Sequence, residues 1–83
     1  MIGKFATSKA GHDKKKVYII MKEDEEYVYL VDGELKTLDK PKKKSKKHIQ
    51  IINRVDENIQ NKLELKQIIY NEDIKRAIKL YWR

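Results

Sequence analysis

The feature that most constrains the fold of this chain is a pair of short apolar runs separated by a few acidic residues. The first run, at residues 16–22, is apolar at five consecutive positions, and the second, at residues 26–31, has the same β-branched and aromatic character. Runs of this length and composition are typical of β-strands. Because residues 23–25 make a short polar connection, we expect the two strands to form a hairpin. Consecutive apolar side chains point to opposite faces of a sheet, so both faces must be covered, as in a small closed barrel.

Three further segments complete the predicted sheet. Residues 4–7 are expected to form the first strand, and residues 36–38 and 48–52 the fourth and fifth. Gly11 and Gly33 lie in turns between these segments, where we expect a positive φ or a close approach of the backbone. Five short strands with hairpin turns predict a small antiparallel β-barrel of the SH3-like kind.

The second part of the chain changes to a helical period. Apolar residues recur at every fourth position across residues 55–63, which predicts a helix with Asn53 as its N-cap. A second helix is expected to open at Asn71, with two acidic residues in its first turn. Neither helix is long enough to be stable alone in water. We therefore expect a barrel domain at residues 1–52 and a two-helix tail at residues 53–83 that packs on the barrel or on a partner.

Positive charge is the strongest functional signal in the composition. The 83 residues contain 20 lysines and arginines against 13 aspartates and glutamates, a formal net charge of +7. Such a balance indicates a polyanionic partner, either a nucleic acid or an acidic membrane surface. Because most of these cations are lysines, they suit contact with phosphates as point charges better than bidentate readout of base edges.

Much of this charge is concentrated in residues 40–47, where six of the eight positions are lysines. Pro41 disfavours a helix here, so we interpret the segment as an extended, mobile arm that follows a phosphate backbone. Repulsion among six like charges, which a bound RNA would relieve, favours this interpretation. The alternative is a solvated loop whose charge only aids solubility.

Residues 8–14, Ser-Lys-Ala-Gly-His-Asp-Lys, with an apolar strand on either side, resemble the KOW motif of ribosomal proteins and transcription elongation factors. The similarity continues through residues 31–34 and the lysine run to residues 48–49. This longer pattern, over roughly residues 2–52, is similar to bacterial KOW-domain RNA-binding proteins related to the L-fourteen-e group of large-subunit ribosomal proteins. The chain departs from that family at Lys15, where a glycine is common.

The resemblance implies a non-catalytic domain that binds structured RNA, above all ribosomal RNA of the large subunit. It implies RNA contacts in the loop at residues 9–16 and in the lysine run before the last strand. For the loop, a plain hairpin connection is the alternative interpretation. The implied RNA-binding residues are Lys9, Gly11, His12, Lys14, Lys15, Lys16, Lys40, Lys42, Lys43, Lys44, Lys46 and Lys47.

An enzyme is not expected from this sequence. His12 and His48 are its only histidines, cysteine is absent, and there is no metal-ligand spacing or nucleotide-binding glycine loop. We therefore expect no catalytic residue, metal, cofactor or small-molecule substrate. The longest apolar run is far shorter than the ~20 residues that cross a bilayer. Residues 1–10 lack the character of a signal peptide, so we expect a cytoplasmic protein without a membrane partner.

A protein-interaction module is the alternative function. The SH3-like barrel and the helical tail could together act as a ribosome- or transcription-associated adaptor. The acidic residues 23–26, at a hairpin tip away from the lysine loop, would suit such a contact. Trp82 either closes the core of the tail or anchors a partner. Tyr27 and Tyr29 share one face of a strand, which could stay exposed for stacking on bases.

Overall fold

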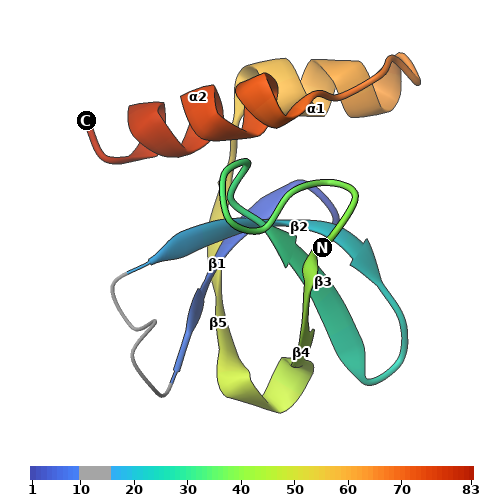
Figure 1. Ribbon diagram of the computed structural model, residues 1–83, viewed down its shortest axis with the longest axis vertical. Helices are drawn as coiled ribbons and strands as arrows, with labels where there is room; N and C mark the ends of the chain where they lie inside the picture. Colours follow the sequence, from blue (N-terminus) through green and yellow to red (C-terminus); the bar gives the residue numbers. More distant parts are fainter. Residues whose placement is uncertain (10–15) are drawn as a thin grey trace.

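The computed structural model describes residues 1–9 and 16–83, in which five strands form one antiparallel sheet with two helices across one of its faces (Figure 1). The strands are β1 (Lys4–Ser8), β2 (Val17–Glu23), β3 (Tyr27–Val31), β4 (Lys42–Ser45) and β5 (Ile49–Val55). They lie in the order β4-β3-β2-β1-β5, and one turn of 3-10 helix, η1 (Lys46–His48), joins β4 to β5. The predicted combination of an antiparallel sheet and two helices is confirmed. Within the described residues β4 and β5 are the two edges of the sheet, which is open and not a closed barrel.

Strand β2 lies at the centre of the sheet and is buried on both faces, as its unbroken apolar run predicted. Val17 and Ile19 pack in a first core cluster that is shared with the helices, whereas Tyr18 and Ile20 pack in a second cluster built from strand residues alone. The first cluster comprises Phe5, Val17, Ile19, Val31, Ile59, Ile74 and Ala77. The second comprises Ala6, Tyr18, Ile20, Val28, Leu30 and Ile49. The pairing register of β2 with β3 shifts just after Ile20, and such an irregularity bends a strand around the core that it covers.

The expected fourth strand at residues 36–38 is wrong. This segment belongs to a bent connection, because the Asp32 carboxylate accepts hydrogen bonds of 2.9 Å from the backbone N–H groups of Glu34 and Lys36. Such side-chain bonds to the following backbone hold a turn in place of a strand. The fourth strand forms later, inside the lysine run, where Lys42–Ser45 pairs with β3.

The helices are α1 (Glu57–Glu64) and α2 (Asn71–Tyr81). The expected N-cap at Asn53 is wrong, because β5 continues to Val55 and remains paired with β1. Asp56 caps α1 instead, since its carboxylate accepts a hydrogen bond of 3.0 Å from the backbone N–H of Ile59. The expected start of the second helix at Asn71 is confirmed. In the described part of the chain no helix is long and apolar enough to cross a membrane.

The tail packs on the sheet. Ile59 of α1 and Ile74 and Ala77 of α2 are buried in the first cluster against Phe5 and its strand neighbours. The sheet and the helices therefore share one core, and β5 runs past the expected boundary at residue 52.

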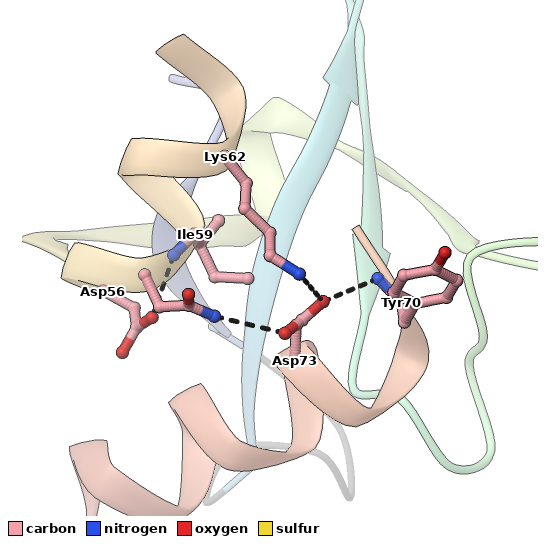
Figure 2. Close-up of polar contacts among 6 residues, drawn as sticks. Asp56, Ile59, Lys62, Tyr70 and Asp73 are labelled. Carbon is pink, nitrogen blue, oxygen red and sulfur yellow. Dashed lines mark hydrogen bonds and ion pairs between the residues drawn. The ribbon is translucent and has the colours of Figure 1, made fainter. Parts of the chain in front are cut away.

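Asp73 joins the two helices at their connection (Figure 2). Its Oδ2 accepts hydrogen bonds from the Lys62 ammonium of α1 at 2.8 Å and from the backbone N–H of Tyr70 at 2.9 Å. Its Oδ1 accepts a third bond, of 3.2 Å, from the amide of Asn58. The Lys62 contact, followed by the Tyr70 N–H and the Asn58 amide, holds the pKa of the Asp73 carboxyl below its ordinary value. One carboxylate thus caps α2 and fixes α1 beside it.

Gly33 lies where the start of α2 packs closely against the connection between β3 and β4. Its φ is +83°, and a Cβ atom here would lie 2.6 Å from the Asn71 carbonyl oxygen. On the other side of the contact, the Asn71 side-chain oxygen accepts a hydrogen bond of 2.9 Å from the Leu38 backbone N–H. Both reasons expected for a glycine at this turn, a positive φ and a close approach, are therefore confirmed.

Among the described residues two glycines have a positive φ, and they allow a matched test of this contact. We expect Gly33→Ala to lower the free energy of unfolding by about 1–3 kcal/mol, because the new Cβ adds strain at positive φ and meets backbone atoms. Gly3→Ala, at φ +92°, should cost less, because its Cβ meets mainly the flexible tip of Leu63. Urea unfolding of both variants measures the difference in the free energy of unfolding. Equal decreases in the two variants would show that α2 does not pack closely against Gly33.

The Asp73 carboxylate predicts a specific loss of stability in acid. A carboxyl whose pKa is lowered in the folded state stabilises the protein above its ordinary pKa, and this stabilisation is lost as the pH falls through the lowered value. We expect Asp73→Asn to reduce the free energy of unfolding by about 1–2 kcal/mol at neutral pH and by much less in strong acid.

Glu72→Gln is the matched control for this prediction, because Glu72 is an exposed acid in the same helical turn. Unfolding curves recorded at several pH values should separate Asp73→Asn from wild type only at neutral pH. A constant difference between these two proteins down to strong acid would contradict a role for the charge.

Candidate nucleic-acid interface

The lysine run forms an edge strand and is not a mobile arm. Within β4, Lys42 pairs with Leu30, Lys43 with Tyr29, and Lys44 with Val28 of β3. The segment is extended, as expected after Pro41, but the ladder of sheet hydrogen bonds fixes it. Lysines are common on edge strands, where they hinder pairing with a second sheet. The ladder also fixes the backbone of these lysines, so their side chains leave the strand alternately on its two faces.

The face of β3 that carries Tyr27 and Tyr29 is bordered by lysines on both sides. Tyr29 pairs with Lys22 of β2 and with Lys43 of β4, so these three residues form one row across three strands. The Lys22 ammonium lies 5.3 Å from the centroid of the Tyr29 ring, and the Lys43 ammonium lies 4.3 Å from that of Tyr27. Both tyrosines are half-buried. We call the surface of Lys22, Tyr27, Tyr29 and Lys43 the basic–aromatic row.

The acidic hairpin tip lies against the end of β4, so it is not remote from the lysine run. The Lys46 ammonium is 3.1 Å from the Glu23 carboxylate, and the Lys46 backbone N–H donates to the Glu26 carbonyl at 2.9 Å. Lys46, followed by the amino terminus, keeps the pKa of the Glu23 carboxyl below its ordinary value. Lys46 is thus already engaged with a carboxylate.

The turn of this hairpin is shaped by Asp24. Its carboxylate accepts hydrogen bonds from the backbone N–H groups of Tyr27 at 2.8 Å and Glu26 at 3.0 Å. These two bonds lower the pKa of the Asp24 carboxyl. They also fix the point at which β3 begins, and therefore the position of Tyr27 in the basic–aromatic row.

The start of the first basic loop lies beside η1. The Lys9 backbone N–H donates to the His48 carbonyl at 2.8 Å, directly after the pairing of Ser8 with Ile49. Lys9, Lys47 and His48 are exposed in this region. The two basic segments of the sequence are therefore brought together at Lys9 and η1, although they are far apart in the chain.

The remaining predicted site residues divide into three groups. Gly11, His12, Lys14 and Lys15 lie outside the described residues. Lys40 is exposed before β4, while Lys42 and Lys44 are half-buried, with the Lys42 ammonium 5.7 Å from the centroid of the Tyr18 ring. Lys16 is exposed at the start of β2 and faces a different surface, beside α2.

Neither of two comparisons with known proteins finds a relative of this chain. A scan against protein-family models finds no match to the chain, and a search of curated proteins finds none either. Within the described residues no three His, Cys, Asp or Glu side chains are grouped so that they could hold a metal ion. The features that indicate a nucleic-acid interface are therefore its lysines and tyrosines.

Sequence reasoning did not include Lys22 in the site. It noted that Tyr27 and Tyr29 share a face, but it could not tell which lysines flank them. The alternation of tyrosines in β3 was the available signal. The identity of their neighbours depends on the register of three strands, including the shift after Ile20.

Proposed function

We propose that this protein binds structured RNA without catalysing a reaction, and that the RNA is ribosomal RNA of the large subunit in the cytoplasm. The observation that carries the proposal is the basic–aromatic row, with Lys43 held on an edge strand beside Tyr27. Lys47 within η1 and Lys9 beside it add two further exposed lysines after the end of β4. Lysines of this kind neutralise phosphates, and tyrosine faces accept bases that are not paired.

The order of the strands supports an SH3-like barrel of the KOW type. β1 and β2 flank the loop that resembles the KOW motif, and they pair antiparallel as such a motif requires. The short η1 connection brings the two edge strands, β4 and β5, together at one end of the open sheet (Figure 1). This arrangement fits a partly open barrel whose rim carries Lys9 and Lys47.

Recognition by this surface would depend on backbone shape more than on sequence. Lysine supplies a point charge without the planar fork that reads base edges. An edge strand fixes the backbone that carries these charges, so less backbone freedom is lost on binding than with a mobile arm. The proposed target is therefore a folded RNA whose phosphates match the spacing of the lysines.

A protein-interaction module remains the alternative function. Leu65 and Ile68, in the connection between the helices, are 67% and 70% exposed and could contact a ribosome- or transcription-associated protein. Binding through such apolar side chains would depend much less on salt than binding through lysines. The dependence of affinity on salt therefore separates the two functions.

The test replaces two exposed lysines of the proposed surface in the full-length chain. We expect Lys43→Gln with Lys47→Gln to leave the fold intact, because neither side chain is buried or ion-paired within the described structure. The slope of log affinity for ribosomal RNA against log salt should flatten by about 1.5 units, since each phosphate contact contributes roughly 0.7–0.9.

Lys66→Gln is the matched control, because Lys66 is an exposed lysine that follows α1 in the helical layer. It should leave the salt slope unchanged. Fluorescence anisotropy of labelled RNA at several salt concentrations gives the slopes, and circular dichroism checks the fold. If the double variant binds RNA with the wild-type slope, the lysines of β4 serve only to protect the sheet edge.

A further inference from the structure

A cavity of about 820 Å³ lies on a different surface, between α2, the start of β2 and the connection that follows β3. Lys16, Lys75 and Lys79 line it together with two apolar side chains that are largely exposed, Trp82 at 61% and Leu35 at 74%. Cavities of this size hold small organic ligands in many proteins. Here a cationic rim is combined with an aromatic wall.

Trp82 contacts an aromatic residue that packs on the core, although most of its own surface is exposed. Its ring meets Tyr81 edge to face, with centroids 5.3 Å apart, and the Tyr81 ring lies 4.9 Å from that of the buried Phe5. The possibility that Trp82 closes the core of the tail is therefore not realised. An aromatic side chain that is open to solvent is suited to stacking on a base.

The lysines of the cavity have no carboxylate partner. Lys75 and Lys79 are one helical turn apart on α2 and therefore repel one another. Within the described residues neither of them, nor Lys16, makes an ion pair. Two acids also line the cavity, but the Asp32 carboxylate is engaged by backbone N–H groups of its own turn, and Glu34 is exposed. A bound phosphate would relieve the repulsion on α2.

We propose that this cavity binds one unpaired nucleotide of the RNA, with the base on Trp82 and the phosphate at Lys75 and Lys79. The inference rests on the proposed RNA-binding function and narrows its target to folded RNA that carries an unpaired nucleotide beside a helix. The lysines of the β4 surface contact the backbone of paired and unpaired RNA alike. The cavity adds a preference for the unpaired base, because only a base outside the stack can reach an aromatic face.

Trp82 is the only tryptophan of the chain, so its fluorescence reports directly on the cavity. The full-length protein is titrated with an RNA hairpin that is closed by a non-nucleotide linker and carries one unpaired nucleotide in its stem, and with the same linker-closed hairpin whose stem is fully paired. We expect the first RNA to quench the fluorescence strongly and the second to leave it nearly unchanged. Anisotropy of the labelled hairpins measures binding separately, so that RNA binding and occupation of the cavity are distinguished.

Two variants then test the residues of the cavity. Trp82→Ala should weaken binding of the hairpin with the unpaired nucleotide by between about 5-fold and 150-fold and leave the paired hairpin nearly unaffected. The double variant Lys75→Gln with Lys79→Gln keeps the tryptophan and should weaken its quenching by the unpaired hairpin. Glutamine retains the aliphatic stem of Lys75, which lies against Gly33. Tyr70→Ala, at an exposed aromatic residue away from the cavity, is the control.

The outcomes separate this inference from the proposed function. Binding of both hairpins with equal affinity and no change in tryptophan fluorescence would overturn the cavity and leave RNA binding intact. Quenching by a free mononucleotide but not by the RNA would also overturn the inference, as would a stronger response to poly-glutamate, which would indicate an acidic protein partner. If anisotropy detects no binding of RNA at low salt, the proposed function itself is contradicted.

Discussion

Ile19 and Ile20 are neighbours in the central strand, point to opposite faces of the sheet, and are both fully buried. A strand with two apolar faces must be buried by other elements on each side, and a chain of 83 residues has few elements with which to bury both. The helices provide one cover, and strand residues that pack among themselves provide the other. The contacts of Asp73 and Gly33 then hold the helices where this packing requires them.

Because packing uses both faces of the centre of the sheet, the surfaces left for a partner lie at its edges and around the helices. On the β4 edge, the Lys42 ammonium lies over the Tyr18 ring and the Lys43 ammonium over the Tyr27 ring, so each lysine contributes a cation–π contact as well as its charge. These lysines also keep the sheet from pairing with a second copy. Protection of the edge and attraction of a polyanion are therefore compatible uses of the same side chains.

The central hairpin and the start of α2 could be predicted from the sequence, because the apolar period and the two acids of a first helical turn are local signals. The capping residue could not, because the N-cap is Tyr70 and the Asn71 side chain accepts a hydrogen bond from Leu38 instead. β4 could not be predicted, because lysine has a weak preference for strands. Its strand forms by pairing with the free edge of β3, which exists only in the folded structure. Val55 misled the assignment of α1, since it fits the four-residue helical spacing and also continues β5. The basic–aromatic row and the Trp82 cavity depend on contacts between distant segments, which no local pattern contains.

The pairing of β1 with β5 has a consequence for the order of folding. β2, β3 and β4 follow one another in the chain and pair as neighbours, so their ladders need only short loops to close. The β1–β5 ladder, in contrast, joins Lys4 to Val55 and must close a loop that contains the rest of the sheet. Closing a longer loop costs more chain entropy before any contact compensates for it. One side of β1 therefore stays unpaired until residues 49–55 are available, and we expect the β1–β5 ladder to form after the ladders that join β2, β3 and β4.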